Sequence, residues 1–115
     1  MEHDLSVRLF NFAVNVIIYC RTLKKSTESN IIIYQLIKST TSSPANYEES
    51  QGASSKADFR NKVFISLKEM RESNFWLRIL NAVGNNSKEL NILLKESEEL
   101  KKILGSICSK VSKNT

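Results

Sequence analysis

Apolar residues recur along the chain at intervals of three and four, which is the spacing of one face of an α-helix. In the first segment this face is formed by Leu5, Leu9, Phe12, Val16 and Tyr19. Similar patterns predict helices over residues 4–23, 28–50, 55–83 and 88–111. Because the stretches between them are short, we predict an all-α, up-down-up-down antiparallel four-helix bundle. At 115 residues, the chain is expected to form one domain over residues 1–115.

Residues suited to helix ends mark these boundaries. Ser26 or Thr27 can cap the second predicted helix, and Ser54 or Ser55 can cap the third. Gly84 suits the position just beyond the third helix, because glycine tolerates the left-handed backbone conformation found there. The polar residues that follow can cap the fourth helix. The boundaries therefore agree with the apolar spacing.

The apolar stripes on the first and third predicted helices are wider than one packing surface requires. The additional apolar residues include Phe10, Val14 and Ile17 on the first helix, and Phe64, Phe75, Ile79 and Val83 on the third. A helix that packs on one side only needs a narrower stripe. The width therefore predicts a second contact surface, provided by another subunit.

The segment STTSSPANYEES, residues 39–50, contains the chain's single proline, Pro44. Local rules favour a break there, because proline within a helix removes a hydrogen bond and costs about 3 kcal/mol. Ser39, Ser42, Asn46 and Glu49 nevertheless follow steps of three and four, which would place them on one helical face. We therefore favour a helix kinked near Pro44, in which the preceding hydroxyls bond the freed carbonyls. A break remains the alternative.

A matching polar set lies on the third predicted helix. In an antiparallel hairpin the end of the second helix lies beside the start of the third, so Glu49 can approach Lys62, and Asn46 can approach Ser66 or Glu69. Buried polar groups must be hydrogen-bonded, so such a set would fix the register of the two helices. We predict a structural polar network of Ser39, Ser42, Asn46, Glu49, Lys62, Lys68, Glu69 and Glu72.

The net charge of +5 comes mainly from the second half of the chain, where basic residues alternate with glutamates. Such mixing is typical of solvated helix faces with pairs at i,i+4. The alternative is a surface that binds the phosphates of RNA or DNA, strengthened when oligomerisation brings several copies together. The candidate phosphate contacts are Arg60, Arg71, Arg78, Lys95, Lys101 and Lys102. No base-reading motif accompanies them, so binding would be non-specific and salt-sensitive.

Nothing in the sequence predicts an enzyme, a cofactor or a metal site. The chain has one histidine, His3, and lacks both a CxxC motif and a glycine-rich phosphate loop. Cys20 and Cys108 lie in apolar helical segments, which we interpret as buried thiols in a reducing cytoplasm. No apolar run approaches the 18 residues or more of a membrane span, so we expect no membrane insertion.

Two motifs resemble the 23S rRNA intervening-sequence protein family, a family of four-helix bundles. They are QLIKSTTSSPANYEES and SSKADFRNKVFISLKEMRESNFWLRIL. The residues that fit the first motif are Gln35, Leu36, Ser39, Thr41, Ser42, Ala45, Asn46 and Glu49. Those that fit the second are Ser55, Phe59, Lys62, Lys68, Glu69, Glu72, Trp76 and Leu77. Two departures are Lys38 in place of arginine, and the pair Ser43-Pro44 in place of an apolar and a small residue.

The resemblance implies a four-helix protomer that assembles as a ring-like homopentamer, without an established molecular activity. More distantly, the chain resembles the accessory proteins of diversity-generating retroelements, which are pentameric and basic and bind nucleic acid. Our hypothesis is a non-enzymatic, self-assembling bundle that binds nucleic acid through the basic faces of its third and fourth helices. The alternative hypothesis is an assembly or adaptor module for a protein partner, with no role in nucleic-acid binding.

Overall fold

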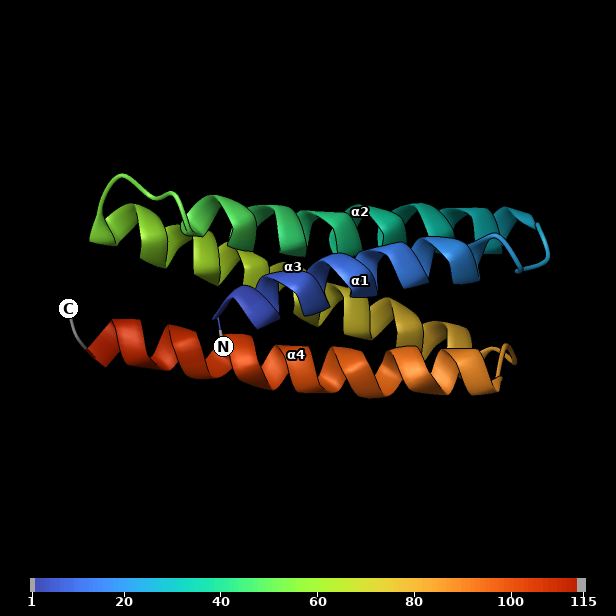
Figure 1. Cartoon of the computed structure of the whole chain (residues 1–115). Coiled ribbons are helices and arrows are strands. Elements are labelled where there is room, and N and C mark those ends of the chain that lie inside the picture. Colours follow the sequence, from blue (N-terminus) through green and yellow to red (C-terminus); the bar gives the residue numbers. More distant parts are fainter. Residues whose placement is uncertain (1, 114–115) are drawn as a thin grey trace.

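The computed structural model describes residues 2–113, with side chains described for residues 5–112. Four helices follow one another along the chain: α1 (Glu2–Cys20), α2 (Thr27–Ser50), α3 (Lys56–Ala82) and α4 (Lys88–Lys113). Consecutive helices run in opposite directions, and α1 also packs against α4, which closes the bundle (Figure 1). The molecule measures 45 × 21 × 20 Å. The predicted all-α antiparallel bundle is confirmed.

The apolar face predicted for the first helix forms one wall of the core. Leu5, Leu9, Phe12, Val16 and Tyr19 are all buried, and leucines from the other three helices pack against them. This burial is the main force that holds the four helices together. Cys20 and Cys108 are also buried and carry free thiols, as the sequence predicted.

Serine caps define the starts of α2, α3 and α4. The Ser26 hydroxyl accepts a hydrogen bond from the backbone N–H of Ser29 at 3.1 Å, and the Ser29 hydroxyl accepts one from the backbone N–H of Ser26 at 2.8 Å. Ser55 caps α3 and Ser87 caps α4 in the same way. These bonds satisfy N–H groups that have no partner within the helix.

The first helix ends at Cys20, three residues before the approximate end at residue 23 that the apolar pattern predicted. The backbone N–H of Thr22 bonds the Tyr19 carbonyl at 2.9 Å, three residues back rather than four. The Thr22 hydroxyl donates to the same carbonyl at 2.7 Å. This tightened turn satisfies the Tyr19 carbonyl in the last turn of α1, and the chain then crosses to the cap at Ser26.

Pro44 lies inside α2, and the helix continues through it without a break (Figure 1). The hydroxyls that precede it bond carbonyls one turn earlier: that of Ser39 donates to Leu36 and that of Thr41 to Ile37. They do not reach the Thr40 carbonyl, which loses its helical donor because proline has no N–H. The predicted continuity is therefore confirmed, whereas the predicted role of these hydroxyls is wrong.

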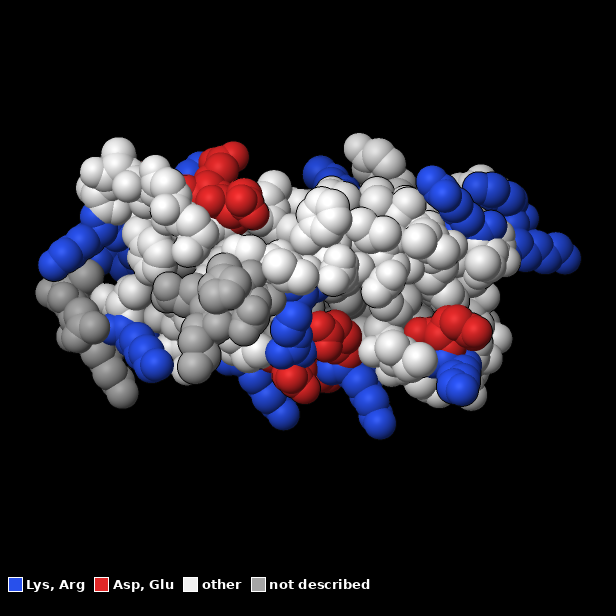
Figure 2. Space-filling view, viewed as in Figure 1, with Lys and Arg blue, Asp and Glu red and all other residues white. Residues whose placement is uncertain are grey.

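An apolar stripe lies on the outside of α1. It consists of Val7, Phe10, Val14 and Ile18, whose exposed fractions lie between 37% and 65%. Figure 2 shows that much of the face carrying α1 has no charged side chains, and that basic residues lie at both of its ends. We call these four residues the outer α1 stripe. No helix in the described part of the chain has the length and apolarity needed to cross a membrane.

Candidate functional site

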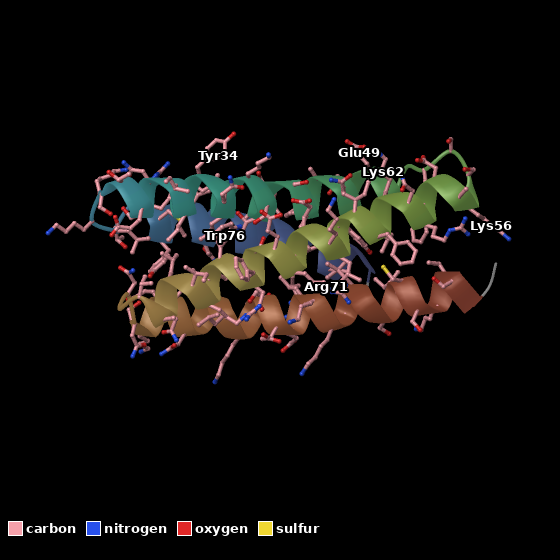
Figure 3. The ribbon with its side chains drawn as sticks, turned by 180° about the vertical axis from the view of Figure 1, so that it is seen from behind. Tyr34, Glu49, Lys56, Lys62, Arg71 and Trp76 are labelled. Carbon is pink, nitrogen blue, oxygen red and sulfur yellow. The ribbon has the colours of Figure 1, made fainter. Side chains whose placement is uncertain are left out.

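The predicted polar network is divided between the surface and the interior. On the surface, Lys62 of α3 pairs with Glu49 of α2, with 2.8 Å between Nζ and Oε1. Figure 3 shows these two side chains beside each other, where the end of α2 meets the start of α3. The hydrogen bond that Lys62 donates to Glu49 raises the pKa of the lysine. The pair is largely exposed, so its contribution to stability is small.

Two members of the predicted network bond each other within one helix. Asn46 Nδ2 donates to the Ser42 carbonyl at 2.9 Å and to the Ser42 hydroxyl at 3.2 Å. Both side chains are partly buried. These bonds support α2 locally instead of joining it to α3.

The remaining predicted members on α3 also have local partners or face solvent. Trp76 Nε1 donates to the Glu72 carboxylate at 3.0 Å. The partly buried Glu69 takes part through its backbone carbonyl, which accepts a hydrogen bond from the Ser73 hydroxyl at 2.9 Å. Lys68 is exposed. The structure therefore brings Glu49 and Lys62 together, but it does not unite the eight residues into one site.

A buried serine seam joins α2 to α3 instead. The Ser43 hydroxyl donates to the Ser66 carbonyl at 2.8 Å, and the Ser66 hydroxyl donates to the Ser43 carbonyl at 2.8 Å. One turn earlier on α2, the hydroxyls of Ser39 and Ser73 lie 2.9 Å apart. All four side chains are fully buried. We call these four residues the serine seam.

The sequence pattern did not identify Ser43 as a buried contact. The predicted polar face lies one residue earlier along α2 than the face that is buried, which contains Leu36, Ser43 and Tyr47. Leu36 and Tyr47 are eleven residues apart, and this spacing places them on the same side of a helix. Those two large apolar side chains were the signal that could have located the buried face.

Four of the six predicted phosphate contacts line one open groove between α3 and α4. Arg71 and Arg78 come from α3, and Lys101 and Lys102 come from α4, around a groove of about 460 Å³. Arg71 is labelled in Figure 3, where it lies between these two helices. We call this feature the basic groove. It brings together positively charged side chains from residues that are distant in the sequence.

The other two predicted phosphate contacts lie outside the basic groove. Lys95 lines a neighbouring depression together with Glu98 and Glu99 and with two cations of the basic groove, Arg78 and Lys102. Arg60 stands eleven residues before Arg71 on α3, about 16 Å along the helix axis. Neither residue lines the basic groove itself.

A buried amide lies at the floor of the basic groove. Asn74 is only 1% exposed, and its Nδ2 donates to the Ser97 hydroxyl and to Glu98 Oε2, both at 2.9 Å. Its Oδ1 accepts a hydrogen bond from Arg78 Nε, also at 2.9 Å. The sequence pattern did not single out Asn74, because an asparagine on a helix carries no signal of its partners.

Glu98 is the acidic residue that accepts a hydrogen bond from the Asn74 amide. Its carboxylate also lies 3.3 Å from the Lys101 ammonium. Partial burial acts to raise the pKa of Glu98, but the hydrogen bonds from Lys101 and Asn74 outweigh it, so the pKa is lowered. The carboxylate is therefore ionised at neutral pH and offsets part of the positive charge nearby.

A separate ion-pair cluster holds α1 to α4. Arg8 donates to Glu96 through Nε at 3.1 Å and through Nη2 at 2.8 Å, and Nη2 also donates to Glu99 at 2.9 Å. These hydrogen bonds, chiefly those to Glu96, raise the pKa of Arg8. We call this cluster the Arg8 clamp. It occupies the closing side of the bundle, away from the basic groove.

Comparison with known proteins places the chain among small helical proteins. A family model described as 23S rRNA-intervening sequence protein matches residues 2–106. A crystal structure of a protein with unknown function from the S23 ribosomal protein family of Bacteroides thetaiotaomicron is 30% identical, with a TM-score of 0.84. The likeness covers 94% of this chain and 97% of that one. None of the curated proteins matches. The chain thus belongs to the 23S rRNA-intervening sequence protein family.

Proposed function

We propose that this protein is a non-enzymatic, self-assembling helical bundle that binds the phosphate backbone of RNA or DNA. The basic groove is the observation that carries this proposal. Four cations from two helices converge there, and the nearby acidic residue Glu98 is already paired with Lys101 and Asn74. A concentrated positive surface attracts a polyanion even where no base is read.

The chemistry of the groove favours phosphates over bases. Its charged side chains are two arginines and two lysines, and both residue types bind phosphate oxygens. If all four cations displace counterions from a single strand, the logarithm of the binding constant should fall with the logarithm of salt with a slope of about −3 per protomer. Binding would then be strong at low salt and weak at high salt, with little sequence preference.

The outer α1 stripe supports self-assembly. Its four apolar residues are separated by two exposed asparagines, and the one charged residue between residues 7 and 18, Arg8, is paired with Glu96 and Glu99. Burying this apolar surface against another copy would remove it from water. From the family resemblance we expect five copies in a ring. Such a ring would bring five basic grooves together and increase the avidity for a long strand.

Paired charge variants test the nucleic-acid proposal. Anisotropy of a fluorescein-labelled 20-nucleotide RNA should be measured at 50 and 200 mM salt with the wild type and with Lys101→Gln/Lys102→Gln. Across this range we expect the wild type to lose about 50-fold in affinity and the double variant about sevenfold, because two of four phosphate contacts are gone. The same measurement with DNA shows whether the sugar matters.

A matched control separates the groove from net charge. Lys24→Gln/Lys25→Gln removes the same two charges from the turn between α1 and α2, where both lysines are exposed. We expect this control to bind almost as the wild type does. Equal losses in the two double variants would contradict the groove, and no binding of the wild type at 50 mM salt would contradict nucleic-acid binding altogether.

Native mass measurement tests the assembly proposal. We expect a particle of five times the 13.1 kDa chain mass, and we expect Phe10→Glu to dissociate it by placing a charge in the outer α1 stripe. Ser109→Glu, an exposed change on α4, is the control and should leave the assembly intact. A wild type that is monomeric at micromolar concentration would contradict self-assembly. Capture of a protein partner that resists nuclease would favour the adaptor hypothesis.

A further inference from the structure

Arg78 is held more firmly than the other cations of the basic groove. Its Nε donates to Asn74 Oδ1 at 2.9 Å, and its guanidinium carbon lies 5.8 Å from the centroid of the Phe75 ring. Among the described residues, no acceptor bonds its two terminal nitrogens. The guanidinium is therefore oriented by one hydrogen bond and one ring, while its terminal N–H groups remain for a ligand.

The hydrogen bonds of Asn74 fix which way its amide faces. An asparagine amide offers two N–H donors on one side and an acceptor oxygen on the other. The donors are used by Ser97 and Glu98, so the oxygen must face Arg78. Because Asn74 is buried and fully bonded, it cannot turn to release the arginine without breaking this network. Arg78 thus loses little side-chain entropy when it binds a ligand.

Glu98 acts as an anion already present beside the groove. One oxygen of its carboxylate accepts from Asn74, and the other lies 3.3 Å from the Lys101 ammonium. A phosphate that enters the groove needs the same ammonium as a partner. The Lys101 side chain can move away from Glu98, because 30% of this side chain is accessible to solvent. The carboxylate and the phosphate therefore compete for one cation.

We propose that Asn74 and Arg78 form a preorganised anchor for one backbone phosphate, and that Glu98 is an internal competitor that weakens binding by holding Lys101. This inference rests on the proposed function and deepens it. When the phosphate binds, Arg78 donates its terminal N–H groups to the phosphate oxygens, and Lys101 exchanges its carboxylate partner for the phosphate. Asn74 is a positioning residue that acts through Arg78, and it does not touch the ligand.

Two lysine substitutions that conserve charge test the anchor. Arg78→Lys removes the guanidinium fork and the hydrogen bond to Asn74, and we expect RNA binding at 50 mM salt to weaken about tenfold. Arg60→Lys is the matched control on the same helix, outside the basic groove, and it should stay within about twofold of the wild type. Equal affinities for the two variants would overturn the anchor, because both keep the same charge.

A double-mutant cycle tests the positioning role of Asn74. Asn74→Ala should weaken RNA binding about as much as Arg78→Lys, because the arginine loses its acceptor. When added to Arg78→Lys, the same change should have no further effect on binding. A further loss in that background would show that Asn74 acts through groups other than Arg78 and would overturn its role in positioning that arginine.

Substitution of Glu98 tests the competition. Glu98→Gln keeps an acceptor for Asn74 but removes the charge that holds Lys101, so we expect RNA to bind about threefold to tenfold more tightly at 50 mM salt. Glu48→Gln removes one negative charge from an exposed position on α2 and should change affinity by less than about twofold. Equal gains in the two variants would overturn the competition.

These outcomes can be distinguished from failure of the proposed function. If the wild type binds neither RNA nor DNA at 50 mM salt, the proposed function fails, and the anchor fails with it. If the wild type binds but Arg78→Lys behaves as Arg60→Lys does, only the anchor fails. Circular dichroism and native mass should be recorded for each variant, so that a misfolded protein is not mistaken for a weak binder.

Discussion

Replacing Ser66 by leucine should strongly destabilise the bundle. The Ser66 side chain is fully buried, and its oxygen lies 2.8 Å from the Ser43 carbonyl oxygen and 3.1 Å from the Ser43 hydroxyl. A carbon atom in the same place would be too close, because carbon and oxygen normally approach to about 3.3 Å. The two methyl groups of leucine would then require α2 and α3 to move apart.

The expected cost can be divided into two parts. Loss of the hydrogen bonds made by the hydroxyl costs about 1 kcal/mol, which is also the cost we expect for Ser66→Ala. Overpacking adds about 1–3 kcal/mol, so Ser66→Leu should cost about 2–4 kcal/mol. A domain of this size has a total stability of about 5–15 kcal/mol, so the loss should be readily measured.

Urea unfolding followed by circular dichroism of the helices measures this cost. The protomer concentration must be kept fixed, because self-assembly would make the apparent stability depend on it. The midpoint should fall by about 1–2 M for Ser66→Leu, whereas Ser109→Leu, at an exposed position on α4, should leave it nearly unchanged. If Ser66→Leu were as stable as Ser66→Ala, the helices would not be held as closely as the serine seam indicates.

Four further predictions concern other parts of the bundle. Arg8→Met should lower the free energy of unfolding by about 1–3 kcal/mol in urea titrations, because it removes the Arg8 clamp; no change would contradict a stabilising role. Gly84→Ala should cost about 1 kcal/mol, because the φ angle of 105° strains any other residue, whereas Gly105→Ala inside α4 should gain about 0.8 kcal/mol. Burial raises the pKa of the Cys20 thiol to about 11, so a thiol reagent at pH 8 should modify it slowly until urea is added; fast labelling of the native protein would contradict its burial. The same raised pKa means that the folded state should lose stability as the pH rises from 9 toward 11, because only the unfolded chain releases this proton readily.

The number, order and direction of the helices could be predicted from the sequence because each depends on local patterns. Apolar spacing marks the helices, and serines followed by a favourable first turn mark their starts. The end of the first helix was misplaced because Leu23 continues the apolar pattern, while the Thr22 hydroxyl bonds the Tyr19 carbonyl in the last turn of the helix. Helix ends depend on such single hydrogen bonds, which apolar spacing does not report.

The buried face of α2 was misplaced because the residues near Pro44 are chemically alike. Ser39, Ser42 and Ser43 differ little in polarity, so two neighbouring faces fit the spacing equally well. Their environment is decided by packing against α3, where small side chains allow the backbones to approach closely. The polarity of these residues does not indicate how closely the backbones of α2 and α3 approach each other.

Predicting the basic groove requires the register of α3 relative to α4, as well as the face that each helix presents. Arg71 and Arg78 are seven residues apart, so their common face could be predicted from the sequence. Arg71 and Lys101 are separated from Asn86, in the turn between α3 and α4, by the same number of residues along the sequence. A hairpin that bends at Asn86 therefore places them opposite each other. The position of that turn was predicted, but the partners of Asn74 depend on side-chain conformations that the sequence does not specify.

The serine seam also affects how the stability of the protein varies with temperature. Exposing apolar surface raises the heat capacity of unfolding, and exposing polar surface lowers it. Because hydroxyls replace apolar side chains at several buried contacts between α2 and α3, the heat capacity change should be smaller than in a bundle packed by leucines alone. The curve of stability against temperature should then be flatter. The bundle should therefore lose less stability on cooling than a bundle of the same helical content packed by leucines alone.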